Sequence, residues 1–98
     1  MAPATVTYFV YILMCSDGTL YIGSTSDLVH RERAHNEGRG AKHTASRRPV
    51  RVVYSEVHES RIAAQRREAQ LKGWSRSKKK ALIDGNRSHL HLLARRRR

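Results

Sequence analysis

Residues 8–24 read YFVYILMCSDGTLYIGS, and this stretch decides the fold. Its first part is rich in β-branched and aromatic side chains and too short for most helices, which predicts a strand over Val6–Met14. Ser16–Thr19 supplies aspartate and glycine for a turn, and LYIGS over Leu20–Ser24 continues as a second short strand. The two strands are therefore expected to form a β-hairpin.

The apolar run Tyr8–Cys15 has an alternative interpretation as part of a signal peptide. No Lys or Arg precedes it, Met14 is not the small residue of a cleavage site, and a turn signal follows at once at Asp17-Gly18. No apolar run approaches the roughly 18 residues that span a bilayer. We therefore expect a buried strand and a cytoplasmic protein. The single cysteine, Cys15, excludes an internal disulfide and Cys-based zinc clusters.

The rest of the chain predicts a helix, a single helical turn, a third strand and two further helices. A chain of 98 residues has room for one core. The order β-β-α-β-α-α is typical of an α+β fold, in which helices cover a small antiparallel or mixed sheet on one side. A stop signal at Asp84-Gly85-Asn86 follows the last helix. The expected ranges are Leu28–Glu37, Ala41–Ser46, Val50–Val57, Glu59 or Ser60 to Gly73, and Ser75–Ile83.

The charge balance points to a polyanionic partner. Twenty Lys and Arg against eight Asp and Glu give a formal net charge of +12. This excess predicts binding to DNA, with RNA not excluded, and no membrane association. Residues 61–80 hold eight basic residues and one acid, a pattern that indicates a track for the phosphate backbone, with a solubility face as the alternative. The predicted contacts are Arg33, Lys42, Arg66, Arg67, Lys72, Arg76, Lys78 and Lys79.

Four side chains near the hairpin are candidates for chemistry. Tyr11 and Tyr21 fall on the two predicted strands and can share one face, although such pairs alone usually serve packing. Arg31 and His35 are four residues apart on a helix with little apolar content, so they share a helical face. His43 has no partner at metal-ligand spacing and is expected at the surface.

The lone acid of the basic region, Glu68, has two interpretations. It is either an i,i+4 partner of Lys72, which is common and weak, or a metal ligand. A carboxylate facing DNA repels phosphate unless a divalent cation lies between them. Two phenols, a guanidinium, an imidazole and a carboxylate can together serve phosphodiester hydrolysis.

These residues, in this order, resemble the GIY-YIG nuclease superfamily, and most of all its small single-domain bacterial branch related to the UvrC N-terminal nuclease. The first signature appears as Phe9-Val10-Tyr11, which keeps the tyrosine and lacks the usual glycine and isoleucine, and the second is intact as Tyr21-Ile22-Gly23. The resemblance covers about residues 6–86. The remaining matches are Arg31, His35, Glu68 within RREAQLKGWSRSKKK, and Asn86 for the late asparagine of the family.

The resemblance implies a three-stranded antiparallel sheet flanked by helices and one divalent ion, Mg²⁺ or Mn²⁺, on Glu68. It also implies that Tyr11 and Tyr21 position and activate the attacking water, with the choice of base left open. Arg31 would stabilise charge on the scissile phosphate. His35 would orient a tyrosine or the phosphate, or relay a proton. Asn86 would complete the catalytic set.

The expected organisation is a leader over residues 1–5, a GIY-YIG-like domain over 6–87 and a basic, largely disordered tail over 88–98. The implied function is a metal-dependent DNA endonuclease, structure-selective or weakly sequence-selective, in DNA repair or processing. The alternative is a nucleic-acid-binding module with a nuclease-like fold that does not cut. A ribosome-associated basic protein would rest on charge alone.

Overall fold

The computed structural model describes residues 6–85 and has the expected α+β architecture. Three antiparallel strands form one sheet in the order β2-β1-β3, so the hairpin supplies the central strand and one edge. The two strand segments around the Asp17-Gly18 turn are confirmed to pair. In chain order the elements are β1 (Tyr8–Met14), β2 (Leu20–Thr25), α1 (Leu28–Asn36), α2 (Lys42–Ala45), β3 (Arg51–His58), α3 (Arg61–Lys72) and α4 (Arg76–Gly85).

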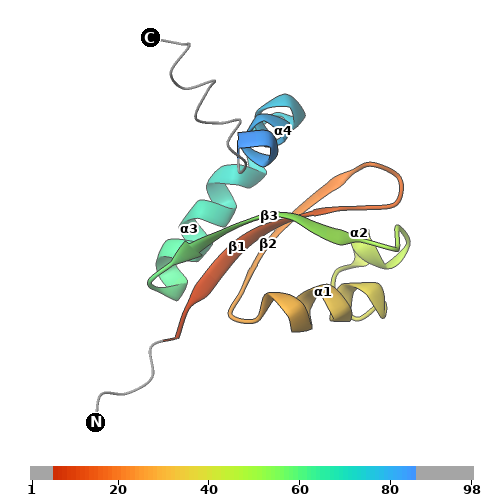
Figure 1. Ribbon diagram of the computed structural model, residues 1–98, viewed down its shortest axis with the longest axis horizontal. Helices are drawn as coiled ribbons and strands as arrows, with labels where there is room; N and C mark the ends of the chain where they lie inside the picture. Colours follow the sequence, from red (N-terminus) through yellow and green to blue (C-terminus); the bar gives the residue numbers. More distant parts are fainter. Residues whose placement is uncertain (1–5, 86–98) are drawn as a thin grey trace.

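Helices cover both faces of the sheet, which corrects the expectation of a cover on one side. Figure 1 shows α1 and α2 below the sheet and α3 and α4 above it. The physical reason lies in β1, whose neighbouring side chains are buried on opposite faces. Val10 and Ile12 pack with Leu71 of α3, whereas Tyr11 and Leu13 pack toward the α1 side. A central strand buried on both faces reads as a continuous apolar run rather than an alternating one.

Element ends differ from the predictions by a few residues. Side-chain caps begin three helices. Asp27 accepts a hydrogen bond from His30 N at 3.0 Å, Ser60 accepts one from Ala63 N at 3.1 Å, and Ser75 accepts one from Lys78 N at 3.2 Å. The last helix runs through Gly85, so the predicted stop after Ile83 comes too early. Among residues 6–85, no helix combines the length and apolar character needed to cross a membrane.

Candidate active site

The register of the hairpin puts Tyr11 and Tyr21 on the same face of the sheet. Tyr11 pairs with Gly23 and Leu13 with Tyr21, so the two tyrosines are diagonal neighbours across β1 and β2. The Tyr11 side chain lies over Gly23, where an added Cβ would stand 2.4 Å from the phenol oxygen. The glycine of the Tyr21-Ile22-Gly23 signature therefore leaves the space that the Tyr11 ring occupies. The predicted shared face is confirmed.

A buried hydrogen-bond chain fixes Tyr11 and His35. The phenol oxygen of Tyr11 is 3.1 Å from His35 Nε2, and His35 Nδ1 is 2.7 Å from Thr44 Oγ1. Thr44 donates its own hydroxyl proton to Ala41 O at 3.0 Å, so it can only accept from His35. His35 is therefore protonated on Nδ1, and its Nε2 accepts the proton of the Tyr11 hydroxyl. All three side chains in this chain are almost fully buried.

Burial and nearby charges keep both rings neutral. Burial raises the pKa of Tyr11 well above its usual range, and the charges of Tyr21 and Glu68 raise it further against the opposing effect of Arg31. Burial also lowers the pKa of His35, and Arg31 on the same helix lowers it further. Tyr11 is therefore a hydrogen-bond donor at neutral pH, and His35 is its acceptor.

The low pKa of His35 leads to a pH-dependent stability that can be measured. Because the fold lowers this pKa, neutral His35 stabilises the folded state above the pKa of about 6.5 that an unfolded histidine has. This contribution is lost as the pH falls through the folded pKa. We expect the free energy of unfolding to decrease by at most about 1.4 kcal/mol per pH unit below pH 6.5 from this group.

Urea unfolding at several pH values, with an NMR titration of the histidine rings, checks this expectation. The His35→Gln variant removes the titrating group and should have a flatter pH dependence between pH 6.5 and 5. The control His30→Gln changes an exposed histidine of the same helix and should keep the wild-type slope. A His35 ring that titrates at or above pH 6.5 would contradict the assignment.

Tyr21 lies between two histidines and faces a more open region than Tyr11. Its ring centroid is 5.3 Å from that of His35, and the His43 ring stacks against it at 6.1 Å with an interplanar angle of 19°. Tyr21 is only partly buried, whereas Tyr11 is 2% exposed. His43 was expected at the surface, but it is half-buried and stacks against Tyr21.

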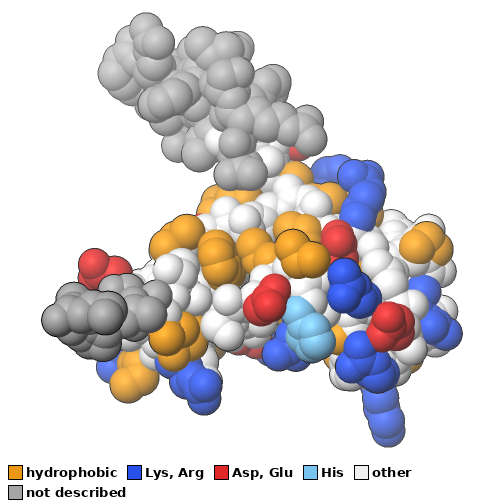
Figure 2. Space-filling view, turned by 60° about the horizontal axis from the view of Figure 1, so that its bottom comes forward, with side chains coloured by type: hydrophobic (Ala, Val, Ile, Leu, Met, Phe, Trp, Pro, Cys, Tyr) orange, Lys and Arg blue, Asp and Glu red, His pale blue; other side chains and the backbone are white. Residues whose placement is uncertain are grey.

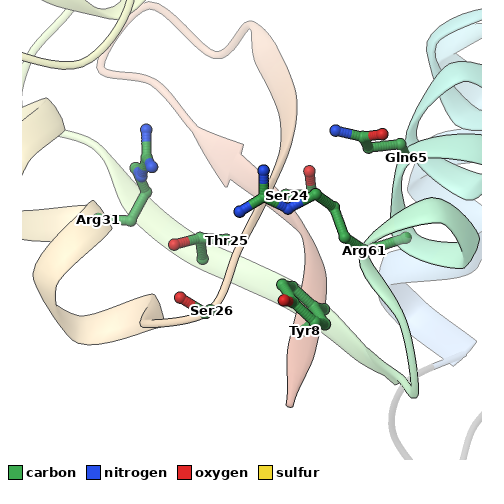
Figure 3. Close-up of a pocket in the computed structure, with 8 residues that line it drawn as sticks. Tyr8, Ser24, Thr25, Ser26, Arg31, Arg61 and Gln65 are labelled. Atoms are coloured by element: carbon green, nitrogen blue, oxygen red, sulfur yellow. The ribbon is translucent and has the colours of Figure 1, made fainter. Parts of the chain in front are cut away.

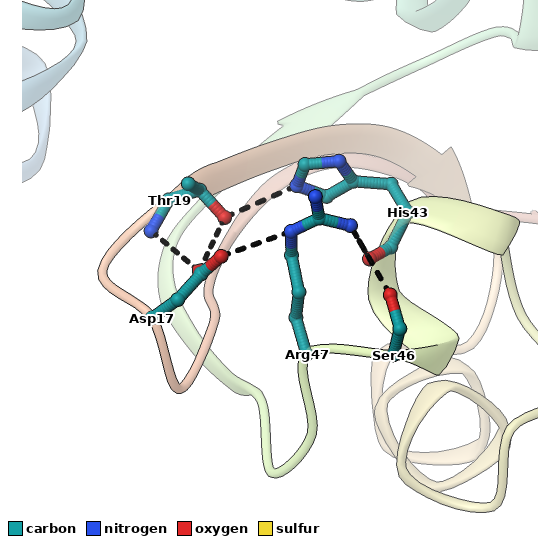
Figure 4. A network of polar contacts seen from close by, with 5 residues as sticks. All are labelled: Asp17, Thr19, His43, Ser46 and Arg47. Atoms are coloured by element: carbon teal, nitrogen blue, oxygen red, sulfur yellow. Dashed lines mark hydrogen bonds and ion pairs between the residues drawn. The ribbon is translucent and has the colours of Figure 1, made fainter.

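A polar network at the hairpin turn holds His43 in this position (Figure 4). Thr19 donates its hydroxyl to Asp17 Oδ1 at 2.7 Å, so its oxygen accepts from His43 Nε2 at 3.1 Å. Arg47 joins Asp17 Oδ2 at 2.9 Å and donates to His43 O at 2.9 Å. The Thr19 hydrogen bonds lower the pKa of Asp17. The network connects the β1–β2 turn to α2 and fixes the ring beside Tyr21.

Glu68 reaches the site from α3, on the opposite face of the sheet. Its carboxylate accepts a hydrogen bond from Ser24 Oγ at 2.7 Å and pairs with Lys72 Nζ at 2.8 Å. The hydrogen bond to Glu68 raises the pKa of Lys72. The ion pair with Lys72 is therefore present, as one of the two interpretations of Glu68 expected. Because the charge of Glu68 also acts on the Tyr11 phenol, the carboxylate lies within electrostatic reach of the tyrosines.

The site is centred on the edge strand β2. Tyr21 projects from one face of β2 and Ser24 from the other, so groups from α1 and from α3 meet across the edge. Two hollows adjoin this edge. One, of about 290 Å³, is lined by Leu20, Tyr21, Ile22, His43, Lys72 and Lys79. The other, of about 240 Å³, includes Ser24 and Arg31 in its lining.

The predicted phosphate contacts do not form one continuous track. Arg67 faces β3, where it bonds Glu56 Oε2 at 2.9 Å and lies over the Trp74 ring, and Lys78 lies over the same ring. Lys72 and Lys79 border the β2 edge. Arg66 and Arg76 are exposed, as are Arg33 and Lys42 on the α1–α2 side. Figure 2 shows that side, where basic side chains are interspersed with acidic ones.

Five of the six predicted catalytic residues lie together. Arg31 is exposed on α1 and its charge acts on both Tyr11 and His35. Asn86 lies outside the described residues. Sequence reasoning missed Ser24, His43 and Thr44, which the fold brings to the site from a strand end and from α2. These three residues do not stand at a spacing that marks them as site residues. Only Ser24 could have been found from a motif, because it directly follows the intact Tyr21-Ile22-Gly23 signature.

Three comparisons relate the chain to known proteins. Residues 7–81 match the family model described as the GIY-YIG catalytic domain. A UPF0213 protein of Staphylococcus aureus is 48% identical over 77 residues, which cover 79% of this chain and 94% of that relative. The solution structure of a UPF0213 protein from Bacillus halodurans matches with a TM-score of 0.52 and 41% identity, covering 80% of this chain and 83% of that one. A solution structure from E. faecalis matches with a TM-score of 0.53 and 40% identity, covering 74% and 78%.

Proposed function

The chain belongs to the GIY-YIG catalytic domain family, and on this premise we propose that it is a divalent-metal-dependent endonuclease that hydrolyses phosphodiester bonds in DNA. The observation that carries the proposal is the meeting of Tyr11, Tyr21, Arg31, His35 and Glu68 at the edge of β2. Structure-selective or weakly sequence-selective cleavage, a role in DNA repair or processing, and a cytoplasmic location remain predictions.

The two tyrosines take different parts in the proposed reaction. Tyr11 is buried and donates its proton to His35, so it serves to position the imidazole beside Tyr21. Tyr21 is partly accessible and is assigned the contact with the attacking water. Negative charge on its phenol oxygen would be stabilised by Lys72, since the two groups interact electrostatically. We prefer Tyr21 as the group that takes the proton of the attacking water, because Tyr21 is partly accessible and Tyr11 is buried.

Arg31 is assigned to the scissile phosphate. Its guanidinium is exposed at the rim of the site and carries a fixed positive charge next to the buried Tyr11–His35 pair. A planar guanidinium can donate two parallel hydrogen bonds to phosphate oxygens, and donors placed where charge develops lower the barrier. His35 remains neutral there, so the positive charge at this point comes from Arg31.

The donor set fits a magnesium or manganese ion that is shared with the substrate. Within residues 6–85, no three His, Cys, Asp or Glu side chains lie together, so a closed protein cage is absent from this part of the chain. Mg²⁺ is commonly held by one or two carboxylates, substrate phosphates and water, and Glu68 can supply the carboxylate. When bound, the ion would act as a Lewis acid on the phosphate and the leaving oxygen.

A second candidate function is nucleic-acid binding without cleavage. The observation in its favour is that both carboxylate oxygens of Glu68 already have protein partners, Ser24 and Lys72. If these contacts persist on the substrate, one lone pair of each oxygen is already used, and the Lys72 ammonium competes with a cation for the charge of the carboxylate. Steep salt dependence of binding with no metal-dependent product would support this function.

Plasmid nicking with Mg²⁺ or Mn²⁺, against a chelator control, tests the proposal. We expect cleavage that requires the metal and falls about 10²–10³-fold in Arg31→Ala, since loss of one donor at a developing charge has that effect. The control Arg39→Ala removes an exposed arginine that pairs with Glu37 just after α1, and it should retain activity. Equal activity of all proteins, or cleavage that resists the chelator, would refute the mechanism.

A further inference from the structure

The hollow of about 240 Å³ beside the site has the lining of an anion subsite. It lies between the N-terminal ends of α1 and α3, at the end of β2. Figure 3 shows Arg31 on one side, Arg61 and Gln65 on the other, and Ser24, Thr25 and Ser26 between them. Tyr8 and Ala64 complete the lining.

The chemistry of this lining selects a phosphate oxygen. Two guanidinium groups, four hydroxyls and one amide belong to the lining residues, and none of these residues is acidic. Ser24 donates to Glu68 and Thr25 donates to Asp27 O at 3.4 Å, which leaves Ser26, Gln65 and the two arginines as donors to the hollow. Arg–phosphate pairs are among the strongest charge-assisted hydrogen bonds in proteins.

Arg61 has no acidic partner within the described part of the chain. It is the first residue of α3, where the helix dipole disfavours a cation, and that first turn holds no acid. No carboxylate among residues 6–85 lies within ion-pair distance of it, and its recorded partner is the Tyr8 ring, 6.0 Å from Arg61 Cζ. A positive charge at this point stabilises neither the helix nor an ion pair, and an external anion would account for it.

Distances along the elements relate the hollow to the catalytic groups. Arg61, Gln65 and Glu68 lie on one stripe of α3, and the seven residues from Arg61 to Glu68 span roughly 10 Å at about 1.5 Å per residue. Ser24 lines the hollow and also bonds Glu68, so the hollow begins beside the carboxylate and Arg61 lies at its far end. Arg61 is therefore placed to contact a neighbouring phosphate of the same strand rather than the scissile one.

We propose that the Arg61 end of this hollow binds a backbone phosphate of the substrate next to the scissile one, through the Arg61 guanidinium and the Ser26 hydroxyl. The inference rests on the proposed function, because only a nuclease has a scissile bond. The binding of the phosphate can nevertheless be tested without cleavage. The substrate strand would have to continue past the cleavage site on the α3 N-terminal side. A strand that ends at the cleavage site would leave the subsite empty.

Binding without cleavage tests the subsite independently of catalysis. Fluorescence anisotropy of a labelled duplex in a chelating buffer should give about tenfold weaker binding for Arg61→Gln, with a salt slope that is smaller by about one. The control Arg51→Gln removes an exposed arginine on the opposite edge strand and should change affinity less than twofold. Circular dichroism of both variants checks that α3 is intact.

Duplexes with one uncharged methylphosphonate, moved along the strand, locate the contact. One position should weaken binding of the wild type by about tenfold and leave binding of Arg61→Gln unchanged. The proposal would be overturned if Arg61→Gln and Arg51→Gln lost the same amount of affinity. It would also be overturned if no methylphosphonate position made the wild type and Arg61→Gln bind equally well. Inorganic phosphate that displaces the duplex at equal ionic strength from the wild type but not from Arg61→Gln would support the proposal. Phosphate that binds through Arg61 without displacing the duplex would assign the hollow to free phosphate and overturn it. Failure of cleavage with these binding results intact would refute the nuclease function alone.

Discussion

Glu68→Gln is expected to remove metal-dependent cleavage while leaving the fold intact. The amide keeps the shape of the side chain and an oxygen that can accept the Ser24 hydrogen bond, but it loses the charge that would hold a cation. A metal ion contributes several kcal/mol to stabilising transition-state charge, so the rate should fall by about 10³-fold or more. The ion pair with Lys72 has side chains 20% and 54% exposed, and its loss should cost less than about 1 kcal/mol of stability.

Single-turnover cleavage over a range of Mg²⁺ concentrations, with urea unfolding in parallel, measures both effects. The control Glu59→Gln changes an exposed carboxylate next to the start of α3 and should cleave like the wild type. Substantial activity of Glu68→Gln at saturating metal would show that the carboxylate is only a partner of Lys72. In that case the metal would have to bind at another site, since cleavage itself contradicts the non-catalytic candidate function.

Gly23→Ala is expected to impair stability and activity together. The added Cβ would stand 2.4 Å from the Tyr11 phenol oxygen and 2.6 Å from its Cζ, and the Tyr11 side chain is too deeply buried to move freely. Overpacking of this kind costs about 1–3 kcal/mol. The displaced ring would lose its hydrogen bond to His35, and misplacement by an ångström can reduce the rate about 10²-fold.

The control for this substitution is Gly73→Ala at the end of α3. A Cβ there would lie 3.5 Å from Gln70 O, an ordinary contact, and the backbone is in the right-handed helical region. We expect Gly73→Ala to be neutral or stabilising by up to about 1 kcal/mol. Thermal unfolding and nicking assays compare the two variants. A Gly23→Ala protein with wild-type activity would show that Tyr11 has no positioning role.

A double variant separates packing from chemistry at this point. Combining Tyr11→Phe with Gly23→Ala removes the phenol oxygen and with it the closest overlap, although the contact to Cζ remains. The two substitutions should therefore be non-additive, and the double variant should recover part of the stability that Gly23→Ala loses. Its activity should stay low, because the hydrogen bond to His35 is absent.

Much of the fold could be predicted because local periodicity carries it. The hairpin turn at Asp17-Gly18 and the alternation of strand side chains put Tyr11 and Tyr21 on one face, as the structure confirms. The i,i+4 spacing of Arg31 and His35 likewise predicted a shared helical face from local backbone geometry. The cover of helices on both faces was missed because a continuous apolar strand does not by itself say which helix packs where.

The sequence by itself determined the order of the elements, the family and the shared faces of neighbouring side chains, because these follow from backbone geometry over short separations. Only the tertiary structure decided that Glu68 meets β2 from the opposite face and that Thr44 sets the tautomer of His35. It also decided that His43 stacks on Tyr21. Those contacts join residues brought together by the packing of α2 and α3 on the sheet, and they depend on long-range burial that no local spacing records.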